Sequence, residues 1–243
     1  LYLADHPVQP ASFPARLTGV AATHGFDKAR RAAAMANIVL SEGAARLRAD
    51  GGIMTPIPGS DDVWWLGIEV STGGLDGFEL ASAERDARTL VWRGVAALQA
   101  HVPGFERVNV SATGPKIGIR ETRHVATLDP LREPALAAGA HPPDSVAIGC
   151  WPMEIHHATG KVEYRVIGGA GTYGIQLGAL RSRDFDNLWL AGRNIGADNA
   201  AYASARVMAT AFATGHAAGV AATTTDASIT TIQAALRGQG AVL

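Results

Sequence analysis

The sequence predicts an α/β fold in which helices and strands alternate along a chain of 243 residues. Three stretches carry this prediction. Residues 79–101 repeat apolar side chains at helical spacing, residues 187–191 form a continuous apolar run typical of a buried strand, and residues 204–222 read as a long helix of small residues. Hydrophobic residues make up 47% of the chain and charged residues 18%, which is the composition of a globular protein with a core.

The composition also limits the function classes. The net charge is −1 and the basic residues form no runs, so the chain lacks the electrostatic footprint of a nucleic-acid-binding protein. Its single cysteine, Cys150, rules out an internal disulfide and fits a reducing, cytoplasmic location; we interpret this residue as a small buried side chain. No signal peptide or membrane span is predicted, because the most apolar stretch, residues 200–222, contains Arg206 and His216.

Elements of the first third are predicted from spacing and turn residues. Residues 1–27 are rich in Pro and Gly and read as extended chain. Apolar residues three to four apart predict an amphipathic helix over residues 28–50, with Asp27 as its cap and Gly51 at its end. Residues 63–70 read as a strand between turn signals, so that its two adjacent tryptophans would point to opposite faces of the sheet.

The middle of the chain is predicted to hold shorter elements. After the helix at residues 79–101, residues 106–128 read as strands with a Gly-Pro turn between them. A Pro- and Ala-rich loop is expected over residues 129–145, followed by two short strands at residues 146–151 and 162–167.

The last third contains a strand, a glycine turn and a helix in succession. The strand at residues 187–191 runs into Gly192, and the helix starts with Ser204 as a suitable N-cap. Free N–H groups in the first turn of a helix carry partial positive charge, which suits a phosphate or an oxygen that gains negative charge. Many α/β proteins contain such a unit without any ligand, so the unit alone leaves a structural and a binding interpretation open.

Several ordered motifs extend this pattern over residues 78–222. In this order along the chain they are PGFE at 103–106, IGIRETR at 117–123, MEIHH at 153–157, NLWLAGRNI at 187–195, SARVMAT at 204–210 and GHAAG at 215–219. Together they resemble the FAD-dependent oxidoreductases of the FAD/NAD(P)-binding fold, in particular the group with an AGR element and a following RVM helix.

This resemblance implies a fold and a division of the chain. The chain would form the C-terminal part of an FAD/NAD(P)-binding, Rossmann-like fold together with an α+β substrate or cap region. Residues 1–150 would belong mainly to the cap region, and residues 151–243 would return to the FAD-binding domain with its last parallel strand and C-terminal helix.

The resemblance also implies FAD as the cofactor and assigns residues to it. The first group of cofactor-binding residues would lie beside the pyrophosphate and ribityl chain and consists of Gly192, Arg193, Asn194 and Ile195. The second group, at the start of the helix, would lie near the pyrimidine edge of the flavin and consists of Arg206, Val207 and Met208. The helix dipole would then stabilise negative charge on the reduced ring.

One part of the family's fold is missing from the predicted elements. The family begins with a strand–G-x-G-x-x-G–helix unit that holds the pyrophosphate. Residues 168–171 are rich in glycine, but we interpret them as a flexible crossing because this stretch lacks both the G-x-G-x-x-G spacing and a following helix. A buried strand at residues 187–191 without parallel neighbours would leave backbone groups unpaired, at roughly 1–3 kcal/mol each. We therefore expect a heteromer, in which a second polypeptide or a cleaved N-terminal segment supplies the dinucleotide-binding motif.

Candidate catalytic residues lie in two of the motifs. His156 and His157 are the best candidates for a base, although a structural role is open for either of them. Arg120, which lies beside Glu121, would bind an acidic group or stabilise a developing charge; a salt-bridge network is the alternative. A metal site built on the two histidines is disfavoured, because adjacent residues of a strand do not face one metal ion.

The sequence therefore predicts a part, either a subunit or a fragment, of a flavin-dependent oxidoreductase. It would dehydrogenate a small organic substrate with FAD as the hydride acceptor. The alternative is a non-catalytic accessory or substrate-binding subunit that kept the fold without the cofactor.

Overall fold

A computed structural model describes residues 2–3, 6–21, 27–158, 160–225 and 228–243 of the chain. The chain forms two compact units, which we describe separately. The sheet unit consists of Val8–Thr122 and His156–Lys161, and the C-terminal unit consists of Leu1–Pro7, Arg123–Ile155 and Val162–Leu243. The chain passes from one unit to the other after Pro7, Thr122, Ile155 and Lys161. The division into a substrate or cap region and an FAD-binding region stays a prediction.

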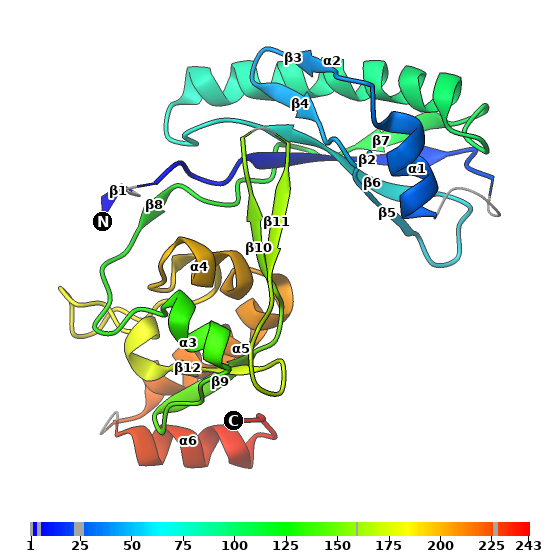
Figure 1. Ribbon diagram of the computed structural model, residues 1–243. Helices are drawn as coiled ribbons and strands as arrows, with labels where there is room; N and C mark the ends of the chain where they lie inside the picture. The colour runs from blue at the N-terminus through cyan, green and yellow to red at the C-terminus, as the bar shows by residue number, and fades with distance from the viewer. Residues whose placement is uncertain (1, 4–5, 22–26, 159, 226–227) are drawn as a thin grey trace. The chain divides into compact units, whose positions relative to one another are not determined.

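The sheet unit is built on an antiparallel six-stranded sheet. Its central strand β6 pairs with β2 on one side and with β4 and β5 on the other, while β7 extends the sheet beyond β2 and β3 extends it beyond β4 (Figure 1). The bounds of the strands are Ala11–Thr18 for β2, Ser41–Glu42 for β3, Ala45–Leu47 for β4, Ile53–Pro56 for β5, Val63–Val70 for β6 and Asn109–Thr113 for β7.

A long helix, α2 (Gly77–His101), lies along one face of this sheet (Figure 1). Asp76 caps its start by accepting a hydrogen bond from the N–H of Glu79 at 2.8 Å. Trp65 is fully buried, while its neighbour Trp64 is 39% exposed, which confirms that the two tryptophans point to opposite faces. The helix over residues 79–101 and the strand over residues 63–70 are both confirmed.

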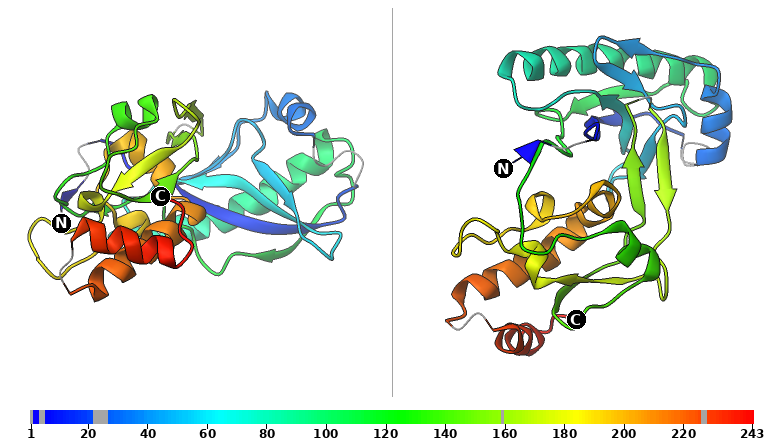
Figure 2. Two further views of the ribbon diagram at one scale, coloured as in Figure 1. Left: turned by 90° about the horizontal axis from the view of Figure 1, so that it is seen from below. Right: turned by 60° about the vertical axis from the view of Figure 1, so that its left-hand side comes forward.

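The C-terminal unit packs helices against the antiparallel pair β9–β12. Helices α5 and α6 lie next to each other in this unit, orange and red in Figure 2. The strands are β1 (Tyr2–Leu3), β8 (Arg123–His124), β9 (Ser145–Gly149), β10 (Met153–His156), β11 (Val162–Arg165) and β12 (Tyr173–Gln176). The helices are α3 (Glu133–Ala138), α4 (Asn199–Ala205), α5 (Met208–Thr223) and α6 (Ile229–Gly238), with 3₁₀ turns η1 (Leu177–Leu180) and η2 (Gly192–Asn194).

The helix predicted over residues 28–50 is too long. Asp27 does cap it, accepting from the N–H of Arg30 at 3.0 Å, but helix α1 spans only Lys28–Met35. The following apolar residues form β3 and β4 because β4 pairs with β6, where Ala45 lies opposite Val70. Tertiary pairing thus overrides the helical spacing of the sequence. The loop expected over residues 129–145 is wrong in part, since it contains α3.

The prediction of a strand buried on both faces at residues 187–191 is wrong. Leu188 is 40% exposed, and the segment makes only an isolated antiparallel bridge, between Arg181 and Trp189. Its further backbone bonds, such as that from the N–H of Leu190 to the carbonyl of Leu180 at 2.8 Å, follow the same irregular pairing. The apolar run lacks the flanking parallel strands, among the described residues, that would hold it as a regular strand.

The single helix predicted from Ser204 to residue 222 consists of two helices, α4 and α5. Ser204 is not an N-cap: it lies buried in the last turn of α4, which Asp198 caps by accepting from the N–H of Ala201 at 2.9 Å. The helix is interrupted at Val207, whose backbone is extended (φ −71°, ψ 156°) and which is the N-cap residue of α5. Propensity alone does not mark this break, because every residue around it tolerates a helix.

The fold is a mixed α/β fold with antiparallel sheets, and a parallel Rossmann-type sheet is not among the sheets of the described residues. The prediction that the glycine-rich stretch lacks the G-x-G-x-x-G spacing is wrong, because Gly169, Gly171 and Gly174 have this spacing. Gly174, however, lies in β12, so a strand and not a helix follows these glycines.

Cys150 is exposed and not buried as predicted. Among the described residues, no helix has the length and apolar character that crossing a bilayer requires.

Candidate active site

The glycine turn η2 is packed tightly against α5. Gly192 has a positive φ of 58°, a conformation that favours glycine, and a Cβ atom placed on it would lie 3.3 Å from the Cβ of Ala211. Its backbone N–H donates a hydrogen bond of 3.0 Å to Oγ1 of Thr214. The turn thus lies directly over the first half of α5.

The next three residues of the AGR element differ in their surroundings. Ile195 is buried in the core, whereas the side chains of Arg193 and Asn194 are exposed. The hydroxyl of Tyr202 in α4 donates to the carbonyl of Arg193 at 3.2 Å. The backbone of the turn is therefore fixed by both helices, while its two polar side chains face outward, where they are able to contact a ligand.

The N-terminus of α5, which is the positive end of the helix dipole, has no side-chain cap. Val207 is the N-cap residue, and its apolar side chain accepts no hydrogen bond, so it does not satisfy the N–H groups of the first turn. Met208, the first helical residue, is 79% exposed. Arg206 is half-buried and donates from Nη2 to the carbonyl of Glu154 at 3.2 Å, which holds its guanidinium beside β10.

The structure thus brings the two predicted cofactor-binding segments, residues 192–195 and 206–208, to the same end of one helix. Ala211, which Gly192 approaches, is only three residues from Met208. An uncapped helix start next to a glycine turn offers N–H donors and close backbone approach, and these suit phosphates and carbonyl oxygens. The residues present therefore fit a dinucleotide cofactor.

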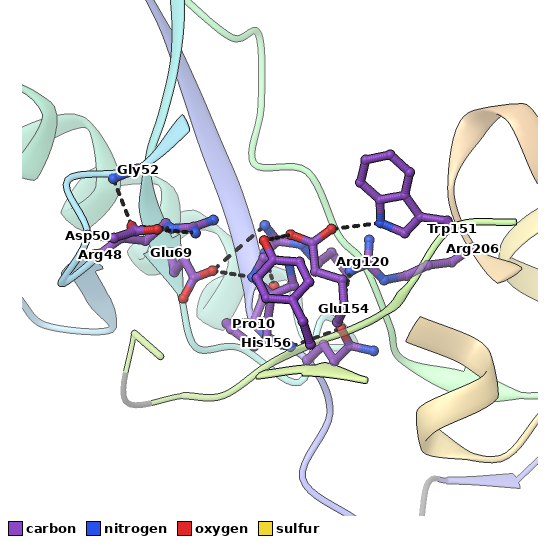
Figure 3. A network of polar contacts seen from close by, with 12 residues as sticks. Pro10, Arg48, Asp50, Gly52, Glu69, Arg120, Trp151, Glu154, His156 and Arg206 are labelled. Atoms are coloured by element: carbon purple, nitrogen blue, oxygen red, sulfur yellow. Dashed lines mark hydrogen bonds and ion pairs between the residues drawn. The ribbon is translucent and has the colours of Figure 1, made fainter. Parts of the chain in front are cut away.

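A second group of predicted residues lies in the sheet unit. Nδ1 of His156 is 2.5 Å from Oε1 of Glu69, and both side chains are buried, at 5% and 3% exposed (Figure 3). The same carboxylate oxygen is 3.9 Å from Nη2 of Arg120, which also donates through Nη1 to the carbonyl of Pro10. His156 and Arg120 therefore meet at Glu69.

His157 has a different environment. Its side chain is exposed, and its backbone N–H donates to the carbonyl of Lys161 at 2.9 Å in the turn that follows β10. The two adjacent histidines thus do not share one site. A role as base stays a prediction for both of them.

Glu69 is a polar residue that the sequence analysis did not single out, whereas Glu154 lies in the MEIHH motif. Glu154 is buried and accepts hydrogen bonds from Nε1 of Trp151 at 2.9 Å and from the hydroxyl of Tyr164 at 3.0 Å. For Glu69 a signal was available, because it is the one charged residue in the strand sequence VWWLGIEV. A charged side chain inside an otherwise apolar strand is rarely buried unless it has a partner.

Tyr173 lies in the core of the C-terminal unit. Its hydroxyl contacts Oγ of Ser204 at 2.8 Å, and Ser204 in turn donates to the carbonyl of Trp151 at 2.5 Å. Burial raises the pKa of Tyr173 to about 12, so the hydroxyl stays protonated at neutral pH. Tyr173 is therefore a structural hydrogen-bond donor.

A cavity of about 630 Å³ in the sheet unit contains none of the predicted site residues. Its lining includes three carboxylates and consists of Gly19, Val20, Ala21, Pro56, Ser60, Asp61, Asp62, Gly104, Glu106 and Arg107. Asp62 is already engaged, because Nε of Arg16 contacts its carboxylate at 2.5 Å. Volume alone gives this cavity no chemical assignment.

Comparison with known proteins agrees with the flavin interpretation. A family model described as "FAD dependent oxidoreductase" matches residues 5–236, which is nearly the whole chain. No curated protein and no solved structure matches the chain. Since the match spans both units and includes the AGR turn and the RVM helix, the chain belongs to the FAD-dependent oxidoreductase family, whose cofactor is FAD.

Proposed function

We propose that this chain is the catalytic part of a flavin-dependent oxidoreductase that dehydrogenates a small organic substrate. The observation that carries the proposal is the packing of the glycine turn on α5. The N–H of Gly192 donates a hydrogen bond to Thr214, which lies within two turns of the uncapped helix start at Met208. Close backbone approach and uncapped N–H groups together suit a phosphate or a carbonyl oxygen.

Two sets of residues would hold the FAD. Residues 192–195 would lie along the pyrophosphate and ribityl chain, and Arg206, Val207 and Met208 would approach the pyrimidine edge of the flavin. When bound, FAD supplies an acceptor for the two electrons that the substrate gives up. The N–H groups at the start of α5 and the guanidinium of Arg206 would stabilise negative charge at that edge.

The substrate must also lose a proton, and the candidate groups for this step are the predicted catalytic residues. His156, or alternatively the exposed His157, would accept the proton from the substrate. Arg120 would stabilise negative charge that develops on the substrate, or bind an acidic group of it. The contact of His156 and Arg120 with a common carboxylate supports the assignment of these residues to one functional cluster.

The dinucleotide-binding motif would come from a second polypeptide or from a cleaved N-terminal segment. Two observations support this part of the proposal. The only G-x-G-x-x-G spacing that the structure describes, Gly169 to Gly174, leads into strand β12, and the apolar segment at residues 187–191 lacks parallel neighbours among the described residues. The heteromeric state is a proposal that the experiment below tests.

Absorbance spectroscopy and intact-mass spectrometry of the purified native protein test this function. A flavin absorbance spectrum, one FAD per chain and bleaching on addition of an oxidisable substrate would support it. A colourless protein that does not take up added FAD, even together with any partner chain seen in the mass spectrum, would favour the non-catalytic accessory subunit. The same mass spectrum identifies a partner chain and shows whether the flavin is covalently attached.

A further inference from the structure

We infer that Glu69 is a positioning residue that holds the proton of His156 on Nδ1 and so makes Nε2 the basic atom of the ring. The inference rests on the proposed function, in which His156 is a candidate base. Glu69 itself touches neither substrate nor cofactor in this assignment; it acts through the histidine. The contact that carries it is the 2.5 Å distance between Oε1 of Glu69 and Nδ1 of His156.

The sheet fixes the direction of Glu69. The residue lies on β6 between Ile68 and Val70, which both belong to the hydrophobic core of the sheet unit. Because side chains alternate along a strand, Glu69 points to the opposite face of the sheet from these two. On its two sides β6 is paired, with Ser12 opposite Glu69 in β2 and Arg46 opposite it in β4. A carboxylate on the central strand has little freedom to move.

His156 is fixed from the other side. Its backbone N–H donates to Oε1 of Gln9 at 3.3 Å, and the turn after it approaches β4, where a Cβ atom on Gly160 would lie 3.5 Å from the carbonyl of Leu47. Backbone and ring of His156 are thus held by separate partners within one unit. Such restraint is what a positioned base requires.

The hydrogen bonding of Glu69 is unequal between its two oxygens. Oε1 contacts His156 and lies 3.9 Å from Nη2 of Arg120, whereas Oε2 is buried and has no hydrogen-bond partner among the described residues. A buried polar atom without a partner costs about 1–3 kcal/mol and is rare in folded proteins.

The chemistry follows from the tautomers of imidazole. A carboxylate accepts hydrogen bonds and does not donate them, so Nδ1 of His156 must carry the hydrogen in their contact. A neutral ring with its hydrogen on Nδ1 has its lone pair on Nε2. Nε2 would then accept a proton from an O–H or N–H group of the substrate, and FAD, when bound, would supply the acceptor for the hydride that the substrate's C–H bond gives up. The carboxylate of Glu69 would stabilise the imidazolium that forms.

Histidine ¹⁵N NMR on the native holoenzyme tests the tautomer without reference to activity. His156 is assigned by comparison with the His156→Asn variant. In the neutral ring we expect a protonated Nδ1 and an unprotonated Nε2, and we expect the Glu69→Gln variant to lose this preference. A neutral His156 with its hydrogen on Nε2 in the wild-type enzyme would overturn the inference, whatever the variants do.

Turnover gives an independent reading. For Glu69→Gln we expect kcat to fall about 100-fold, in the range that general acid–base catalysis contributes, with KM little changed and FAD content retained. Asp50→Asn is the matched control, since it is also a carboxylate-to-amide change in the sheet unit but its partner is Arg48 and not a histidine. Its kcat should equal that of the wild type.

The outcomes separate the two levels of the proposal. If His156→Asn abolishes turnover and Glu69→Gln does not lower kcat, the positioning role is wrong while the proposed function stands. If the native protein neither binds FAD nor oxidises any substrate, the proposed function is wrong, and the NMR spectrum still reports whether Glu69 holds the Nδ1 tautomer.

Discussion

The backbone N–H of Gly192 donates a 3.0 Å hydrogen bond to Oγ1 of Thr214, a side chain that is fully buried in α5. The same hydroxyl donates to the carbonyl of Thr210 at 2.9 Å, one turn earlier in the helix. Thr214 therefore links the helix backbone to the glycine turn. Any ligand held by this turn depends on that link for its position relative to the helix start.

Replacing Thr214 with valine tests this link. Valine keeps the shape of the side chain but removes the acceptor, which leaves the N–H of Gly192 unsatisfied. We expect a loss of about 1–3 kcal/mol in the free energy of unfolding together with weaker FAD binding, measured by denaturant titration and by fluorescence titration with FAD. Thr223→Val is the control, because Thr223 makes the same type of bond within α5, to the carbonyl of Gly219 at 3.1 Å, on the exposed side. Equal FAD affinities for the two variants would contradict the role of Thr214.

Gly94→Ala is expected to destabilise the sheet unit although alanine is the better helix former. A Cβ atom on Gly94 would lie 2.6 Å from the ring of the fully buried Trp65, which has no room to move aside. Overpacking of this kind costs about 1–3 kcal/mol and exceeds the gain of up to about 1 kcal/mol from helix propensity. Gly77→Ala in the same helix meets no atom within 4 Å, so it should be neutral or stabilising. Denaturant unfolding of both variants measures the difference, and a stabilised Gly94→Ala would show that the core adapts.

Tyr173→Phe is expected to change how stability depends on alkaline pH. An acid whose pKa is higher in the folded than in the unfolded protein destabilises the fold once the unfolded form ionises. The contribution of Tyr173 to the free energy of unfolding is thus fully present below pH 10 and is lost as the pH rises toward about 12. The phenylalanine variant should lack this decline, and at neutral pH it should lose about 1 kcal/mol because the bond to Ser204 is gone. Parallel unfolding curves of the two proteins between pH 9 and pH 12 would contradict the burial of this hydroxyl.

Asp50 is expected to contribute to the acid stability of the sheet unit. Burial alone would raise the pKa of Asp50, but the hydrogen bonds and charge of Arg48, the N–H of Gly52 and the charge of Lys28 lower it from 3.8 to about 2. A carboxylate with a lowered pKa stabilises the fold above pH 3.8, and this stability is lost as the pH falls toward about 2. Asp50→Asn should be less stable than the wild type at neutral pH and should show a flatter dependence over this range, measured by urea unfolding. An unchanged slope would mean that Arg48 does not stabilise the ionised form.

The sequence predicted the elements whose pattern is local. The helix α2 and the strand β6 follow from apolar spacing and turn residues, and Asp27 caps α1 as its position before the helix indicates. The end of α1 could not be predicted in this way, because residues 41–47 form strands only through pairing with β6. Long-range pairing leaves no trace in helical spacing.

The same limit applies to the candidate site. The ordered motifs singled out residues 192–195 and 206–208 as candidates, but the break between α4 and α5 depends on Val207, which nothing in the local sequence marks as a helix start. Glu69 lies 87 residues from His156 along the chain, so their contact becomes visible only in the folded sheet unit. Contacts between side chains that lie so far apart along the chain depend on the topology of the fold.

The most direct test of the FAD site is the affinity for FAD of a Met208→Glu variant of the native protein. A carboxylate at the first residue of a helix stabilises the helix by about 0.3–1 kcal/mol, so the variant should fold at least as well as the wild type. Its negative charge would oppose a flavin edge or phosphate at the same place, and we expect the Kd for FAD to rise about tenfold or more, a change of roughly 1.4 kcal/mol. The neutral Met208→Gln variant should bind FAD nearly as well as the wild type. An unchanged Kd in the folded Met208→Glu protein would show that FAD does not bind at the start of α5.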